Sequence, residues 1–156
     1  MDSRIKVEIV TGTFDQAAEI AAVTGGRSDI GAVVTFTGLC RDEEGRLAAL
    51  ELEHYPGMAE RELTRIAEQA ATRWPVKALT ILHRHGKIAP GEPIVLVVAA
   101  SEHRHAAFEA AEFVMDFLKT HAPFWKKEHG HAGEGGWVAA KDADDDAAAR
   151  WAENSG

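Results

Sequence analysis

Hydrophobic residues recur along the chain with two different periods, and the change from one to the other predicts a mixture of strands and helices. Strict alternation and short apolar runs indicate strands, whereas apolar residues at every third or fourth position indicate helices. The predicted strands are residues 5–10, 32–37, 49–54, 76–85, 94–100 and 137–140. The predicted helices are residues 15–23, 58–74, 101–119 and 142–151.

Two neighbouring elements indicate how the fold is assembled. Residues 94–100 (IVLVVAA) are apolar throughout, which is typical of a central strand. In the helix that follows, with Ser101 as its expected N-cap, Glu109, Glu112 and Asp116 share one stripe and apolar residues the other, so it should lie flat on the sheet. Because strands and helices mix without regular βαβ alternation, the pattern predicts an α+β fold with a mostly antiparallel sheet flanked by helices.

Nothing in the pattern divides the chain. Its 156 residues, 46% of them hydrophobic, suffice for one core, so we expect a single domain over residues 1–156. The glycine-rich segment 129–136 (HGHAGEGG) should be a mobile loop. No apolar run approaches the roughly 18 residues of a membrane helix, no signal peptide opens the chain, and the single Cys40 excludes an internal disulfide. These features predict a cytoplasmic protein.

The distribution of charge favours a small anionic ligand. A net charge of −8 disfavours nucleic-acid binding, which needs a broad basic surface. Residues 117–127 (FLKTHAPFWKK) nevertheless contain three lysines, one histidine and no carboxylate. A local positive patch on an acidic protein attracts a small anion rather than a polymer.

Three lysines in or beside this patch are candidates for chemistry. Lys119 falls at the border of the helix's polar stripe, where partial desolvation would prepare an amine for acid–base or covalent work. The alternative is an ordinary lysine near a helix C-terminus, whose stem covers apolar surface. Lys126 and Lys127 follow Pro-Phe-Trp and should project from a stiff loop, although a plain solvated pair fits the sequence equally.

Candidates for anion binding lie elsewhere in the chain. His103 and Arg104 follow the most apolar strand near a helix N-terminus, where free N–H groups and a guanidinium suit a phosphate. A capping histidine beside a surface arginine is the alternative. Arg41 follows a predicted strand end, and Gly38 would allow a ligand close to the backbone. Cys40 reads better as a buried, inert thiol than as a nucleophile.

Histidine spacing gives little support to a metal site. His83 and His85 form one His-Arg-His pattern, and His103 and His105 form a second. Neither pair has the helical spacing or the neighbouring carboxylates of a recognisable zinc motif. We therefore expect no metal and no cofactor.

Several segments together resemble one known family, that of the molybdopterin synthase large subunit. The resemblance covers about residues 30–151, and its most specific stretches are LEHYPGM and LKTHAPFWKKE. The segments are GAVVTFTG (31–38) leading to Arg41, LEHYPGM (52–58), RWP (73–75), SEHRHAAFEA (101–110) and MDFLKTHAPFWKKE (115–128).

The resemblance implies a fold, an activity and partners. It implies an α/β hammerhead-type domain in a homodimer that binds a small ubiquitin-like sulfur carrier at each end, giving a heterotetramer. The carrier would deliver sulfur from a C-terminal Gly-Gly thiocarboxylate to cyclic pyranopterin monophosphate (precursor Z), forming the dithiolene of molybdopterin. No metal is implied for this step.

The resemblance also implies roles for individual residues. Lys119 would lie beside the thiocarboxylate, and Lys126 would bind and polarise the pterin. The remaining implied contacts to substrate are Arg41, His103, Arg104, Lys127 and Glu128. Leu39 departs from the family, which often has a lysine there. The rival hypotheses are a non-catalytic module that binds a ubiquitin-like partner and a metal-binding regulator that uses the His-Arg-His pairs.

Overall fold

In the computed structural model, which describes residues 4–121, 124–131, 135–138, 149 and 151, two four-stranded sheets form the framework. The first sheet has the order β1 (Ile5–Val10), β4 (Val76–Arg84), β6 (Pro93–Ser101), β2 (Ala32–Leu39). The second has the order β5 (Gly86–Ile88), β3 (Leu47–His54), β7 (Phe124–Gly130), β8 (Gly135–Val138). Only the β1–β4 pair is parallel among these ladders, which confirms the prediction of a mostly antiparallel α+β fold.

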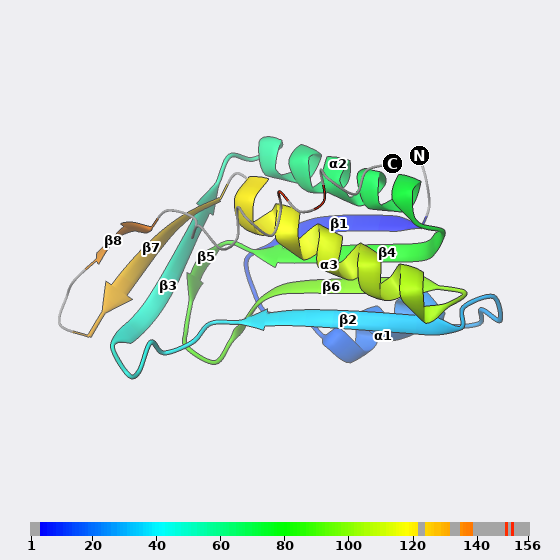
Figure 1. The fold of residues 1–156 in the computed structure, drawn as a ribbon. Coiled ribbons are helices and arrows are strands. Elements are labelled where there is room, and N and C mark those ends of the chain that lie inside the picture. Colours follow the sequence, from blue (N-terminus) through cyan, green and yellow to red (C-terminus); the bar gives the residue numbers. More distant parts are fainter. Residues whose placement is uncertain (1–3, 122–123, 132–134, 139–148, 150, 152–156) are drawn as a thin grey trace.

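Helices cover both faces of the first sheet. Helices α2 (Met58–Arg73) and α3 (Arg104–His121) lie side by side on one face, and α1 (Gln16–Thr24) lies on the other (Figure 1). The second sheet continues from one end of the first, beside the C-terminal end of α3 (Figure 1). This arrangement brings the last turn of α3 next to β7.

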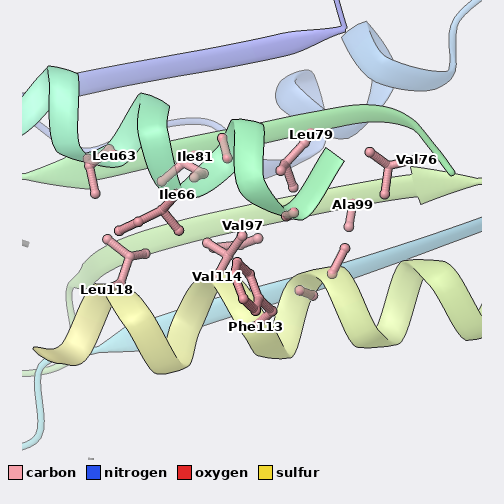
Figure 2. Close-up of a cluster of buried hydrophobic side chains, with 14 of the residues drawn as sticks. Leu63, Ile66, Val76, Leu79, Ile81, Val97, Ala99, Phe113, Val114 and Leu118 are labelled. Atoms are coloured by element: carbon pink, nitrogen blue, oxygen red, sulfur yellow. The ribbon is translucent and has the colours of Figure 1, made fainter. Parts of the chain in front are cut away.

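The main core fills the space between the helix pair and the first sheet (Figure 2). Strand residues alternate between the two faces, so Leu79 and Ile81 of β4 face α2 and α3, whereas Leu82 packs toward α1. Leu63 and Phe113 supply large buried side chains from the two helices. The same alternation puts His83, two residues beyond Ile81, on the face that α2 and α3 cover.

The start of α3 differs from the prediction. The helix begins at Arg104, and Ser101 is the last residue of β6 rather than an N-cap. Ser101 stays in the ladder because it pairs with Ala32 on one side and Val76 on the other. Its buried hydroxyl donates to the main-chain oxygen of His103 and so supports the turn into the helix.

Strand β7 was missed by the sequence pattern. The predicted stiff loop at Lys126 and Lys127 is strand, and so are both ends of the segment 129–136, which was predicted to be a mobile loop. His129 pairs with Gly135 across β7 and β8, while residues 132–134 lie outside the described part. The sequence FWKKEHG has no apolar alternation, because neighbours on both sides rather than hydrophobic burial hold this strand in place.

Two smaller differences concern residues 86–88 and the predicted C-terminal helix. Residues 86–88, which the pattern did not predict as a separate strand, form β5, which pairs with β3 through Leu52 and Gly86. Of the helix predicted at residues 142–151, Ala149 and Trp151 are helical, and the others lie outside the described residues.

Replacing Phe113 with alanine should lower the free energy of unfolding by about 3–5 kcal/mol, because it leaves a cavity between α2, α3 and the sheet. Urea unfolding measures the loss. Phe108 is the matched control, since it lies on the same helix with 60% of its surface exposed. Phe108→Ala should change the stability little, and equal losses at the two positions would contradict this account of the core.

Candidate functional site

Charged side chains gather around a partly buried histidine, His83, where β4, β7 and the last turn of α3 meet. The ring of Phe124, the first residue of β7, stacks on His83 with the centroids 3.9 Å apart and the planes 16° from parallel. Nδ1 of His83 lies 2.9 Å from the main-chain oxygen of Arg84. A carbonyl oxygen can only accept, so Nδ1 carries the proton and Nε2 keeps its lone pair in the neutral ring.

This environment keeps the His83 ring neutral. Burial is the main cause that lowers the pKa of His83 to about 4, and the nearby positive charges of Lys119 and Lys126 and the ring of His54 lower it further. The hydrogen bond to Arg84 raises the pKa and is the second-largest cause, ahead of the charge of either lysine. Both lysines therefore lie within electrostatic reach of one partly buried imidazole, although a strand start and a helix end separate them along the chain.

Strand alternation gives the neighbouring charges of β7 different surroundings. Lys126 pairs with the buried Leu52, and its positive charge acts on the thiol of Cys40, as does the negative charge of Glu128. Lys127 points to the opposite face, where it pairs with Glu51. The structure thus places the Lys126 and Glu128 side chains together and the Lys127 side chain away from them.

The end of β2 supplies Cys40 and Arg41. Cys40 is 3% exposed, which confirms the prediction of a buried thiol. Burial raises the pKa of Cys40, and the carboxylate of Glu43 raises it further, so the thiol stays protonated. The Arg41 side chain is 75% exposed and lies 3.9 Å from Glu43.

The packing of β2 against β6 explains why residue 38 is glycine. An added Cβ would lie 2.8 Å from Cγ1 of Val95 on β6, so the close packing of β2 against β6 requires glycine. The predicted close approach of a ligand is not needed to explain this position.

His103 and Arg104 lie at the far end of α3 from the lysines. Arg104 opens the helix and Lys119 comes fifteen residues later, which separates their backbones by about 22 Å along the axis. The His103 side chain is 84% exposed and lies 3.5 Å from Glu102. One chain by itself therefore does not bring these two residues to the lysines.

Residues that the sequence reasoning did not assign to the site are His83, Phe124 and His54. The rings form a chain of contacts, with His54 lying 5.9 Å from Phe124 and 4.5 Å from His85 between centroids. The His-Arg-His spacing had drawn attention to His83 only as a possible metal ligand. Within the described residues, no three histidine, cysteine or acidic side chains lie close enough to hold a metal ion.

No helix in the described part of the chain has the length and apolar character needed to cross a bilayer.

The chain is similar to known proteins over nearly its whole length. Residues 9–121 match the family model described as MoaE protein. A molybdopterin synthase catalytic subunit from Mesorhizobium japonicum is 67% identical over 150 residues, which cover 96% of this chain and 94% of the relative.

Solved structures agree with the sequence matches. A molybdopterin biosynthesis MoaE protein from Burkholderia ambifaria superposes with a TM-score of 0.82 at 47% identity, covering 95% of this chain and 98% of that one. Molybdopterin synthase from Staphylococcus aureus gives a TM-score of 0.77 at 33% identity, with coverage of 85% and 96%.

The lowered pKa of His83 predicts a pH-dependent contribution to stability. Between the ordinary pKa of histidine and about 4, the unfolded chain takes up a proton at this ring and the folded chain does not. The contribution is complete at neutral pH and is lost as the pH falls. Relative to a His83→Phe variant, the protein should lose roughly 1–2 kcal/mol of unfolding free energy between pH 7 and pH 5.

Urea unfolding of both proteins at the two pH values measures this difference. His105→Phe, at an exposed position, should keep the pH dependence of the unsubstituted protein. Identical pH dependence with and without His83 would show that the ring has the same pKa in the folded and the unfolded chain.

Proposed function

The chain belongs to the MoaE protein family, and we propose that it transfers sulfur through a site built around Lys119 and Lys126. Its activity is that of a molybdopterin synthase catalytic subunit, a sulfurtransferase of molybdenum cofactor biosynthesis. It takes sulfur from the C-terminal thiocarboxylate of a small ubiquitin-like carrier and places it on precursor Z, forming the molybdopterin dithiolene. The observation that carries the site proposal is the stack of Phe124 on His83, which brings the start of β7, two residues before Lys126, to the ring on which the charge of Lys119 also acts.

Two ammonium groups beside a partly buried surface suit this chemistry. When the thiocarboxylate sulfur attacks a pyranopterin carbon, negative charge develops on the substrate, and positioned cations stabilise it. The new carbon–sulfur bond replaces a carbon–oxygen bond at that carbon, whose oxygen leaves after taking up a proton, and a thioester then joins carrier and substrate. Its hydrolysis returns the carrier with an ordinary carboxylate and leaves the sulfur on the pterin, and a second carrier repeats the cycle. In this scheme Lys119 faces the thiocarboxylate and Lys126 the pterin.

The exposed end of the second sheet offers a surface for the carrier. Tyr55 and Trp125 are 58% and 43% exposed, and their rings contact each other at 4.9 Å between centroids. Aromatic side chains of this kind are enriched at protein interfaces. The Trp125 side chain points to the opposite face of β7 from Lys126, so the C-terminal tail of a carrier seated there crosses the strand to reach the lysines, and a diglycine passes where bulkier residues would not.

His103 and Arg104 enter the site from a second copy of the chain. About 22 Å of helix separates Arg104 from Lys119 within one subunit, so a shared phosphate cannot span them. A two-fold dimer supports contacts of both subunits at each of two equivalent sites. In that arrangement, Arg104 of one copy binds the phosphate of the substrate held by Lys119 of the other.

The remaining site residues have supporting roles. Arg41, with its exposed guanidinium, is suited to an anionic part of the substrate. Glu128 shares a strand face with Lys126 and orients its amine, whereas Lys127 contributes through its main chain because its side chain points away. Leu39 is 54% exposed and carries no charge, so Arg41 supplies the positive charge that faces the anionic substrate here.

The cellular setting and domain organisation complete the proposal. We propose that residues 1–156 form one domain and that the protein acts in the cytoplasm, where its partner carrier and the pterin meet. The lack of a membrane-spanning helix in the described residues is compatible with this location.

Lys119→Ala should lower the rate of dithiolene formation by at least about a hundredfold, because it removes a cation that stabilises the developing charge. The assay mixes the protein with thiocarboxylated carrier and precursor Z and measures molybdopterin. Carrier affinity, measured by isothermal titration, should stay within about threefold. Lys87→Ala, at an exposed lysine of β5, is the control and should keep full activity. Normal turnover by Lys119→Ala would remove this lysine from the mechanism.

Mixing subunits tests the shared site. Lys119→Ala and Arg104→Ala should each be nearly inactive alone, but random mixed dimers should recover about a quarter of the normal activity. Half of the dimers are then mixed, and each has one site with both residues intact. A site contained in one subunit predicts no recovery, which is the result that would exclude sharing.

A further inference from the structure

His83 is a partly buried polar group that the proposed mechanism leaves without a role. Its ring lies on the face of β4 that α2 and α3 cover, in an inner strand of the first sheet, with Val95 of β6 and Ile9 of β1 as its strand partners. A polar ring at such a place could have been another aliphatic residue, as Leu79 and Ile81 are on the same face.

Two contacts fix the ring. Stacking on Phe124 sets its plane, and the Nδ1–H donated to the Arg84 oxygen at 2.9 Å sets its rotation. With Nδ1 committed as donor, Nε2 is an acceptor at the opposite edge of the ring. The tautomer is therefore determined by the backbone of the same strand.

Two positive charges act on the His83 ring. The titratable groups that act on His83 are Lys119 from α3, Lys126 from β7 and His54 from β3. A lysine ammonium group has three hydrogen-bond donors and no acceptor. In a partly buried site, an acceptor with a fixed lone pair therefore holds the ammonium group in one orientation. A third positive charge at this point would instead repel both amines.

We propose that His83 is a positioning residue of the sulfur-transfer site, whose fixed, neutral ring offers the Nε2 lone pair to the lysine ammonium groups and, through its stack on Phe124, sets the start of β7 relative to α3. The residue does not touch the substrate and acts through Lys119 and Lys126. This inference rests on the proposed function of those two lysines.

The turnover of two variants distinguishes the effect of the Nε2 lone pair from the effect of the ring stack on Phe124. His83→Phe keeps an aromatic ring against Phe124 but removes the acceptor, so kcat should fall about 10- to 100-fold, with KM for precursor Z and carrier affinity within about threefold. His83→Gln restores an acceptor oxygen and should recover to within about tenfold of the normal kcat. His85→Phe, the same change at the next histidine of the chain, is the control and should keep normal turnover.

Nuclear magnetic resonance tests the tautomer without relying on a variant's activity. Long-range proton–nitrogen correlation at neutral pH should show His83 with a protonated Nδ1 and a bare Nε2, the signals being assigned by their loss in His83→Gln. The Nε2 signal should shift in Lys119→Ala or Lys126→Ala.

Three results would overturn the proposal. They are a His83→Phe enzyme with kcat within about twofold of normal, equal losses in folded His83→Phe and His83→Gln, and a protonated Nε2 in the unsubstituted protein. If His83→Phe does not fold, the tautomer seen by nuclear magnetic resonance and the turnover of His83→Gln still test the proposal. Normal turnover by both lysine variants would instead refute the proposed function itself, which is a different outcome.

Discussion

The packing of α3 along the first sheet determines where the charged residues of this protein can meet. The helix is held by Phe113, Val114 and Leu118 against strands β4 and β6, so neither its axis nor its rotation is free. Its two ends are therefore fixed far apart, with Arg104 at one and Lys119 at the other. A spacer of this length keeps Arg104 and Lys119 of one subunit from contacting the same small ligand.

The second sheet positions Lys126, as helix α3 positions Lys119. Strand β7 starts at Phe124, whose ring packs on His83, and Lys126 follows two residues later on the face that carries Glu128. The position of Lys126 thus depends on β4 and β3 together. If β7 paired one residue out of register, the side chains of Lys126 and Lys127 would exchange faces. Lys126 would then point away from the proposed site.

Periodicity predicted the elements that bury apolar residues. Strands β1, β4 and β6 and helix α2 appear close to their expected positions because Leu63, Ile81 and Val97 repeat with the period of the element that buries them. Strand β7 could not be predicted in this way, since its residues FWKKEHG serve two neighbouring strands and a site rather than a core. The limits of α3 were likewise decided by the ladder partners of Ser101, which lie 69 and 25 positions away in the chain.

For the site, the sequence indicated which residue types matter but not their arrangement. Lys119 and Lys126 were singled out by local charge and by resemblance, and both act on one imidazole. The place of Lys127 on the opposite face follows from a strand that the pattern did not reveal. The role of His83 depends on a backbone carbonyl and a ring brought in from 41 positions away, and no local pattern contains that information.

The state of Cys40 has a consequence for an enzyme that handles activated sulfur. The chain has one cysteine, and that thiol is covered by Leu47, Leu50, Leu52 and Ile88 and remains protonated. A thiolate beside Lys126 would attack the acyl carbon of the thioester that joins carrier and substrate, so that the carrier would be left bound to the cysteine and the pterin thiolate would depart. By enclosing its one thiol and keeping it protonated, the protein leaves hydrolysis as the route by which the carrier is released.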